Sequence, residues 1–184
     1  MDNGAACYQR YLDGDDNGIV EIIRDYKDGL MLYLNGITGN INIAEELMED
    51  TFFKIATKRP AFHGKSSFKT WLYTIGRNAA IDGMRKRSKI SDQPFDEYTD
   101  LADEESVERE YIREEQKITL HKALRTLTPD YRQVLYLTYF EDFDVDDTAR
   151  IMRKTKKQIG NLLFRAKQSL KKQLEKEGFK YEII

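Results

Sequence analysis

Cysteine, proline and long apolar runs are all scarce in this sequence, which has one cysteine and three prolines among its 184 residues. A lone Cys7 cannot form an intrachain disulfide, so we expect a protein of the reducing cytoplasm. No apolar stretch approaches the roughly 20 residues that a membrane-spanning helix needs. The acidic beginning, MDNGAACYQRYLDGDDNG, also has no apolar segment of the kind found in secretory leaders. We therefore expect neither a membrane span nor a leader.

Residues typical of catalytic and metal sites are equally sparse. The two histidines, His63 and His121, are too far apart in the sequence to suggest a metal pair, and Cys7 has no partner. The sequence has no glycine-rich phosphate loop and no nucleophile elbow. Acidic residues are plentiful, but they cluster without a pairing that would suit acid–base catalysis. We predict no enzymatic activity, no cofactor and no metal.

Charge is unevenly distributed, although the formal net charge is only −2. Residues 61–91 hold seven lysines and arginines against one acid, and residues 153–184 hold ten against three. Between them, residues 92–116 hold eleven acids and two bases. Two such basic blocks suit two contacts with a polyanion, and ordinary solvated helix faces would produce a similar pattern. Charge alone leaves both interpretations open.

Hydrophobic periodicity predicts an all-α fold, with two small helical domains joined by a flexible acidic linker. We place the first domain at residues 1–90, the linker at 91–106 and the second domain at 107–184. Around the linker, residues 89–106 contain seven acids and Pro94 without any apolar period, which is typical of an unstructured segment.

In the first domain, Gly36 is predicted to stop the first helix and Asn42 to cap the next. Small residues would let another helix approach the third helix closely. The predicted helices cover residues 16–35, 43–58 and 68–88. The small-residue stripe consists of Leu72, Gly76, Ala79 and Gly83.

The second domain is predicted to end in a helix-turn-helix. Asp144 can cap a short helix, and Thr155 with Gln158 forms a capping-box pattern that opens a longer one. A short helix, a turn of about three residues and a capped longer helix are the layout of that motif. The predicted helices cover residues 107–126, 129–141, 145–152 and 156 to about 178.

The last helix has one apolar and one polar face, and the polar face suits base edges and phosphates. An ordinary amphipathic surface helix would look similar. Lys156 and Lys157 weaken the first turn through the helix dipole unless an anion lies there. The apolar stripe is Ile159, Leu163, Ala166, Leu170 and Leu174. The polar stripe is Lys157, Asn161, Phe164, Arg165, Gln168 and Lys172.

A second candidate region interleaves aromatic and basic residues, a combination that suits stacking and charge contacts with unpaired bases. Phe68 and Trp71 are equally well explained as core residues. The aromatic group is Phe62, His63, Phe68, Trp71 and Tyr73. The cations are Lys65, Lys69, Arg77, Arg85, Lys86 and Arg87.

These segments together resemble a known family. The stretches AEELMEDTFFKI (44–55) and FHGKSSFKTWLYTIGRNAAIDGMRKR (62–87) resemble the second conserved region of bacterial RNA polymerase sigma factors. LTPDYRQVLYLTYFEDFDVDDTARIM (127–152) and the last helix resemble their fourth region. The resemblance spans nearly the whole chain and leaves no room for further regions, so the chain is similar to the small extracytoplasmic-function (ECF) group of the sigma-70 family. It implies a transcription initiation factor that binds core RNA polymerase and directs it to promoters.

The resemblance also implies residue roles. The single-stranded −10 element would meet Phe62, His63, Gly64, Lys65, Ser66, Trp71, Arg77, Asn78, Arg85 and Lys86. The double-stranded −35 element would meet Lys156, Lys157, Gln158, Asn161, Phe164, Arg165 and Gln168. The clamp helices of the largest polymerase subunit would meet Glu46, Glu49 and Asp50. The fourth region would contact the flap of the second-largest subunit.

The resemblance further implies a membrane-anchored anti-sigma factor as a partner, one that responds to envelope or extracellular stress. Arg153 and Lys154 depart from the family, which usually has glycine and an aliphatic residue in this turn, so the −35 sequence preference stays open.

The alternative function is a stand-alone helix-turn-helix regulator, which would explain residues 128–174 but leave FHGKSSFKTWLY without a purpose. Binding to core polymerase separates the two.

Overall fold

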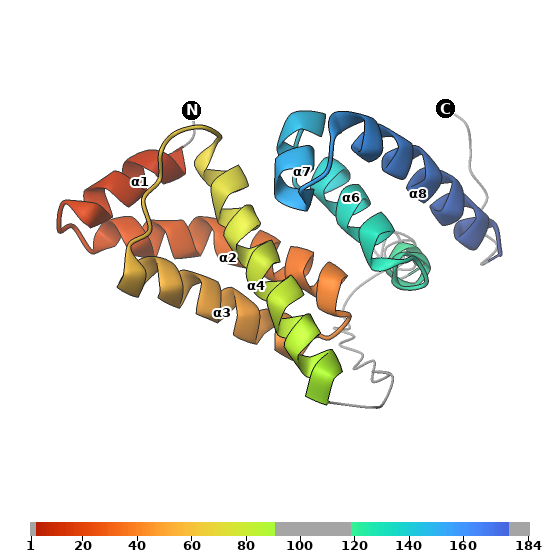
Figure 1. Ribbon diagram of the computed structural model, residues 1–184, viewed down its shortest axis with the longest axis horizontal. Helices are drawn as coiled ribbons and strands as arrows, with labels where there is room; N and C mark the ends of the chain where they lie inside the picture. Colours follow the sequence, from red (N-terminus) through yellow and green to blue (C-terminus); the bar gives the residue numbers. More distant parts are fainter. Residues whose placement is uncertain (1–2, 91–118, 177–184) are drawn as a thin grey trace, which may run out of the picture.

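The computed structural model describes residues 3–90 and 119–176, and the regular structure of this part of the chain is entirely helical (Figure 1). The predicted all-α fold is confirmed. The proposed linker, residues 91–106, lies outside the described residues. Residues 119–125 are also helical. The labelled helices are α1 (Asn3–Leu12), α2 (Asn17–Thr38), α3 (Ile41–Lys58), α4 (Phe68–Ile90), α6 (Pro129–Tyr139), α7 (Val145–Met152) and α8 (Lys156–Lys176).

The predicted boundary between α2 and α3 is wrong at both residues. Gly36 lies inside α2, because the next two residues are buried and continue its apolar face. The helix ends instead at Gly39, which has the left-handed φ of 69° that glycine tolerates and whose N–H donates to the Asn35 carbonyl. Asn40, not Asn42, is the N-cap of α3, and its side chain accepts from two backbone N–H groups.

The helix-turn-helix is confirmed, together with its predicted caps. The Asp144 carboxylate accepts the Asp147 N–H at 2.7 Å and begins α7. At the start of α8 the Thr155 N–H donates to Gln158 Oε1 at 2.8 Å, and the Gln158 N–H donates to Thr155 Oγ1 at 3.2 Å. This reciprocal pair satisfies two donors that the helix itself leaves free.

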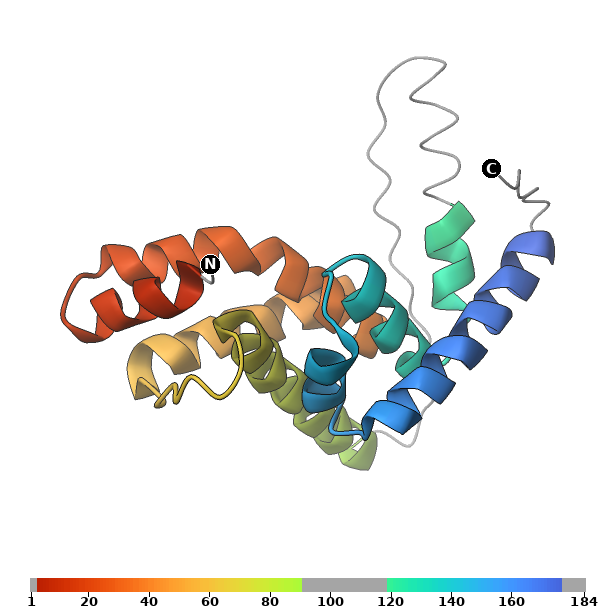
Figure 2. The same cartoon turned by 90° about the horizontal axis from the view of Figure 1, so that it is seen from above.

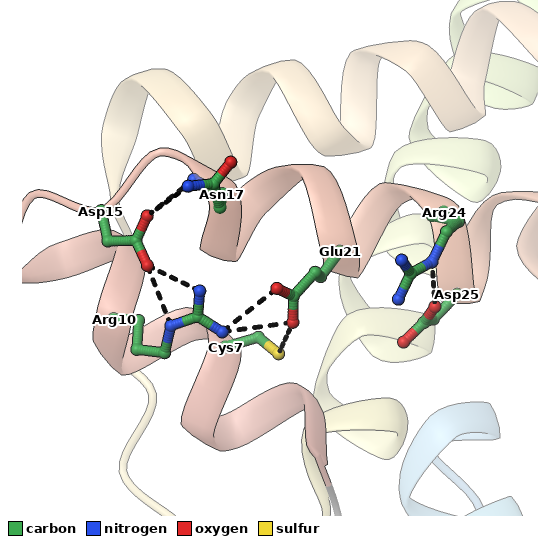
Figure 3. A network of polar contacts seen from close by, with 7 residues as sticks. All are labelled: Cys7, Arg10, Asp15, Asn17, Glu21, Arg24 and Asp25. Carbon is green, nitrogen blue, oxygen red and sulfur yellow. Dashed lines mark hydrogen bonds and ion pairs between the residues drawn. The ribbon is translucent and has the colours of Figure 1, made fainter.

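Helix α1 is a feature that sequence periodicity did not predict. Cys7, Tyr8 and Tyr11 are buried on its inner face. Its outer edge joins α2 through a polar network in which Arg10 donates to Asp15 at 2.6 Å and to Glu21 at 3.2 Å (Figure 3). These bonds to Arg10 lower the pKa of Asp15. The Cys7 thiol donates to Glu21 at 3.2 Å, and burial raises the pKa of that thiol.

The small-residue stripe of α4 works as predicted, because α2 and α3 approach it closely. A Cβ added at Gly76 would lie 2.9 Å from Leu30 Cδ1, and one at Gly83 would lie 3.5 Å from Leu47 Cδ2. Phe68 at the start of α4 is fully buried, with its ring centroid 5.5 Å from that of Tyr8. Phe68 is therefore a core residue.

The second helical unit (residues 119–176) packs directly on the first (residues 3–90). Helix α6 contacts α2, and α7 contacts α4 (Figures 1 and 2). Buried residues of both units form one continuous hydrophobic cluster. Rings cross the junction, with centroids 5.1 Å apart for Tyr73 and Phe143 and 6.3 Å apart for Tyr33 and Tyr136. None of the described helices has the length and apolarity needed to cross a membrane.

Candidate nucleic-acid interface

Helix α8 separates an apolar face from a solvent-exposed face along its whole length. Ile159, Ala166 and Leu174 are buried against the rest of the second unit. Phe164 is 63% exposed, which is unusual for a phenylalanine. All the residues assigned to the −35 element are exposed, namely Lys156, Lys157, Gln158, Asn161, Phe164, Arg165 and Gln168. The structure therefore presents this predicted set to solvent on one helix.

The first turn of α8 already has an acidic partner within the chain. Lys156 Nζ lies 2.7 Å from a carboxylate oxygen of Asp146 on α7. The Gln158 side-chain oxygen accepts the Thr155 N–H in the capping box, so this amide stabilises the helix start in addition to lying on the exposed face. Lys156 and Asp146 also line a polar depression between α7 and α8, together with Arg150 and Lys154.

The turn between α7 and α8 contains Arg153, one of the two residues at which this turn differs from the resembled family, and its backbone is left-handed. Arg153 adopts a left-handed φ of 53°, and its N–H donates to carbonyls at the end of α7. Glycine is the residue best suited to that conformation. Lys154 follows and forms a 3.0 Å ion pair with Asp130 at the start of α6, which holds the turn against the rest of the unit.

The loop before α4 carries the predicted base-binding residues. His63, Gly64 and Lys65 are exposed, and Gly64 has a positive φ of 66°. Ser66 is half-buried. Phe62 is half-buried as well, because its ring packs against Phe68 and Trp71. The loop is thus a short exposed segment anchored on an aromatic core.

Helix α4 carries the remaining residues assigned to the −10 element. Trp71 and Asn78 are half-buried, whereas Arg85 and Lys86 are exposed near the end of the helix. Arg77 is already engaged, because its Nε donates to Gln133 Oε1 of α6 at 2.9 Å. The structure therefore brings the predicted set onto one loop and one helix, with Arg77 turned to the second unit.

The acidic residues assigned to polymerase docking lie on α3. Glu46, Glu49 and Asp50 are all exposed, and a Glu46 oxygen pairs with Arg87 of α4 at 2.9 Å. Sequence reasoning missed Phe53, which is 69% exposed one turn further along the same helix. The adjacent Phe52 is buried. Adjacent residues of a helix point in different directions, so Phe52 and Phe53 cannot both face one core. Their adjacency in the sequence could therefore have predicted that one of the two rings is exposed.

The exposed side chains of these two surfaces are of the kinds that bind nucleic acids. Within residues 3–90 and 119–176, no group of three or more histidine, cysteine or acidic side chains could hold a metal ion. Exposed amides, cations and aromatic rings dominate both regions instead. Such groups recognise phosphates, base edges and base faces.

Comparison with known families matches both regions. The model of sigma-70 region 2 matches residues 22–90, and that of sigma-70 region 4 matches residues 117–170. This chain belongs to the sigma-70 family, in its ECF group. Members of that family are transcription initiation factors, and this sigma factor directs RNA polymerase to promoters.

Individual relatives agree with this assignment. The sigma factor is 29% identical to the ECF RNA polymerase sigma factor SigX of Bacillus subtilis over 160 residues, which cover 82% of this chain and 80% of the relative. It is 28% identical to RNA polymerase sigma factor YlaC of the same organism over 168 residues, covering 87% and 94% of the two chains.

Solved structures also resemble it. The sigma factor RpoE in complex with the anti-sigma factor NepR from Bartonella quintana superposes with a TM-score of 0.69 and 27% identity, over 84% of this chain and 95% of that chain. CnrH in complex with the cytosolic domain of CnrY has a TM-score of 0.63 at 17% identity, over 92% and 96% of the two chains, and shows the shared fold.

Proposed function

We propose that this sigma factor recognises promoters by placing α8 in the major groove of the −35 element and the loop before α4 on the single-stranded −10 element. The observation that carries the proposal is the exposed face of α8. Asn161, Phe164 and Arg165 lie exposed on it at the spacing of one helical face, opposite buried Ile159 and Ala166. Amide and guanidinium groups in a major groove distinguish base pairs, and an aromatic ring can meet a thymine methyl.

At the −10 element, exposed His63 and Lys65 flank Gly64, whose positive φ turns the loop sharply. Proteins hold a flipped-out base through hydrogen bonds to its edge and stacking on aromatic or apolar side chains. Trp71 and Asn78 supply an aromatic edge and an amide on the adjoining helix. Arg85 and Lys86 extend the basic surface towards the DNA backbone.

Docking on core polymerase is assigned to α3. Glu46, Glu49 and Asp50 provide exposed negative charge, and exposed Phe53 adds an apolar anchor beside it. Interfaces typically combine an aromatic anchor with a polar surround. The second unit is proposed to contact the flap of the second-largest subunit. Each DNA contact is weak alone. Because one chain carries both, binding at one promoter element raises the effective concentration of the other contact at its own element, and the overall affinity increases.

Run-off transcription with purified core polymerase, on DNA upstream of the gene for this sigma factor, tests the −10 assignment. Asn78→Ala and Trp71→Ala are expected to abolish the transcript while core binding stays normal. Asn3→Ala removes an exposed amide at the first residue of α1 and should transcribe like the wild type. Equal transcription by all three variants would contradict the assignment. A stand-alone regulator would instead bind this DNA without binding core polymerase at all.

Salt-dependent binding of the holoenzyme to promoter duplex tests the −35 assignment. Asn161→Ala and Arg165→Ala should cost about 1–3 kcal/mol on the preferred sequence and relax its preference at one position. Lys157→Ala should weaken binding to all sequences and reduce the salt slope by about one. Lys171→Ala, which removes an exposed lysine paired with Glu175, is the control. A loss in Lys171→Ala equal to that in Arg165→Ala would refute a specific role for this face.

We further propose that the sigma factor is cytoplasmic and non-catalytic, and that an anti-sigma factor anchored in the membrane controls it in response to envelope or extracellular stress. The complex of RpoE with NepR supports an anti-sigma partner. Co-expression with the product of the neighbouring gene should suppress transcription if that gene encodes a one-span membrane protein. Undiminished transcription would contradict that partner.

A further inference from the structure

The loop before α4 covers residues 60–67, none of which lies in a helix or a strand. Its path therefore depends on the contacts that hold its two ends. At the far end the Ser67 hydroxyl accepts the Thr70 N–H at 3.0 Å, which caps the start of α4. At the near end, where the chain leaves α3, the contacts come from α1 (Figure 1).

Two tyrosines of α1 hold the near end by hydrogen bonds to backbone carbonyls. The Tyr8 hydroxyl donates to the Pro60 carbonyl at 2.8 Å, and the Tyr11 hydroxyl donates to the Ala56 carbonyl at 2.7 Å. Ala56 lies in the last turn of α3, and the residue four positions later is Pro60, which has no N–H to complete the helical pattern. The Tyr11 hydroxyl takes the place of that missing donor.

Arg59, between the two carbonyls, adopts a left-handed backbone with φ 43° and ψ 55°. Side chains other than glycine rarely adopt this conformation, so it persists only where the surroundings hold it. The Arg59 guanidinium carbon lies 4.8 Å from the centroid of the Tyr11 ring. Tyr11 therefore contacts the turn from α3 into the loop through both its hydroxyl and its ring.

The Tyr8 ring connects the start of the loop to the aromatic residues of α4. Its centroid lies 5.3 Å from that of Trp71 and 5.5 Å from that of Phe68. Phe62 of the loop packs on the same tryptophan, with the centroids 5.4 Å apart. Rings at these separations attract one another beyond simple burial. Trp71, which is assigned to the −10 element, is thus supported by α1 and by the loop.

Helix α1 is itself fixed by close packing. A Cβ added at Gly18 of α2 would collide with the Cys7 carbonyl, and one at Gly4 would collide with the Phe68 ring. The ion pairs of Arg10 with Asp15 and Glu21 join its outer edge to α2 (Figure 3). The tyrosine hydroxyls are therefore held at defined positions relative to α2 and α4.

We propose that Tyr8 and Tyr11 are positioning residues for −10 recognition, which fix the path of the loop from α1 without touching DNA themselves. The proposal rests on the proposed function, because that function assigns the loop to the −10 element. The two tyrosines are 1% and 6% exposed, so they act through the loop. A loop that is already ordered loses less conformational freedom when it binds a base, which increases affinity.

Tyr8→Phe and Tyr11→Phe test the two hydroxyls while keeping both rings. Thr51→Val is the matched control, because the buried Thr51 hydroxyl also donates to a carbonyl at 2.7 Å, that of Leu47, but within α3. The control removes a hydroxyl of the same kind without touching the loop. Circular dichroism should show wild-type helix content in all three variants.

Fluorescence of the free full-length chain is the first readout, because Trp71 is the single tryptophan of the sequence. In Tyr8→Phe and Tyr11→Phe its emission should shift to longer wavelength, and acrylamide should quench it more strongly. Thr51→Val should match the wild type. Wild-type emission and quenching in both tyrosine variants would overturn the positioning role, whatever the function of the chain.

Binding of the holoenzyme to a single-stranded −10 oligonucleotide is the second readout. Each tyrosine variant should bind about tenfold more weakly than the wild type, the factor that corresponds to about 1.4 kcal/mol for one lost hydrogen bond. Affinity for core polymerase and for −35 duplex should stay at the wild-type value, and Thr51→Val should match the wild type throughout. Unchanged oligonucleotide affinity in both tyrosine variants would overturn the role in recognition.

A double-mutant cycle with His63→Ala distinguishes positioning from a general loss of stability. His63 is an exposed side chain of the loop. If Tyr8 acts through the loop, Tyr8→Phe should reduce oligonucleotide affinity much less in the His63→Ala background than in the wild type. Additive losses would contradict action through the loop. If the wild-type holoenzyme did not bind the oligonucleotide, the −10 assignment would fail, and the Trp71 fluorescence would still decide whether the tyrosines position the loop.

Discussion

Lys69 on α4 and Glu141 after α6 form a 2.9 Å ion pair, and the Lys69 ammonium also donates to the Glu141 backbone carbonyl, 72 positions further along the chain. The same ammonium lies 4.8 Å from the centroid of the Phe143 ring. One side chain on the first unit thus contacts a carboxylate, a carbonyl and an aromatic face of the second. This contact places the helix-turn-helix beside the helix that carries the proposed −10 residues.

A matched pair of glycine substitutions in α4 should have opposite effects on stability. Gly76→Ala places a Cβ 2.9 Å from a Leu30 methyl group that is fully buried, so packing strain of about 1–3 kcal/mol should outweigh the helix-propensity gain. Gly83→Ala meets Leu47 at an ordinary 3.5 Å and should gain up to about 1 kcal/mol. Urea unfolding measures both, and equal changes would contradict close packing at Gly76.

Arg153→Gly in the helix-turn-helix should stabilise the protein by about 1 kcal/mol, because glycine adopts the left-handed φ of 53° without the clash of a Cβ. Arg153 is exposed, so little packing is lost. The thermal midpoint checks the prediction. Arg150→Gly, which places glycine inside α7, should lower the midpoint instead, and a rise in both variants would argue against relief of strain.

Thr155→Ala should weaken the start of α8 by about 1 kcal/mol, because the Gln158 N–H loses its hydroxyl acceptor. Affinity for promoter duplex should fall with it, since the first turn carries Lys156 and Lys157. Thr155→Ser keeps the hydroxyl and should match the wild type in both measurements. Amide hydrogen exchange in the first turn of α8 gives the local readout, and identical protection in the two variants would exclude the cap.

Raising the pH should weaken the contact between the units. Burial raises the pKa of Tyr73 above its usual 10.0, and the nearby Glu141 carboxylate raises it further. The same two causes raise the pKa of Tyr136. Their contribution to stability is full below about pH 10, and above it the unfolded tyrosines ionise first. The free energy of unfolding should then fall by roughly 1.4 kcal/mol per pH unit for each tyrosine.

Urea unfolding at several alkaline pH values measures this slope. Tyr73→Phe removes one titrating group, so the free energy of unfolding should fall less steeply with pH, by roughly 1.4 kcal/mol per pH unit. A slope that Tyr73→Phe leaves unchanged would show that other groups control the alkaline transition. Tyrosinate absorbance, followed in parallel, reports when the hydroxyls ionise.

Several features were predictable because their signals are local. Thr155 and Gln158 are three residues apart, and so are Asp144 and Asp147, so the caps of α7 and α8 follow from short spacings. The start of α8 and its exposed face follow in the same way. The end of α2 was misplaced because Gly36 and Gly39 carry the same local signal, and only the burial of Ile37 and Thr38 distinguishes them.

The sequence by itself determined the described helices after α1, the helix-turn-helix and the family, because apolar periods, caps and motifs act within a few residues of one another. Tertiary structure alone decided that Arg77 is directed to Gln133 and that Glu141 enters the space beside Gly29. These outcomes depend on partners tens of residues away, and on which face of each helix finds a neighbour. No local spacing carries that information.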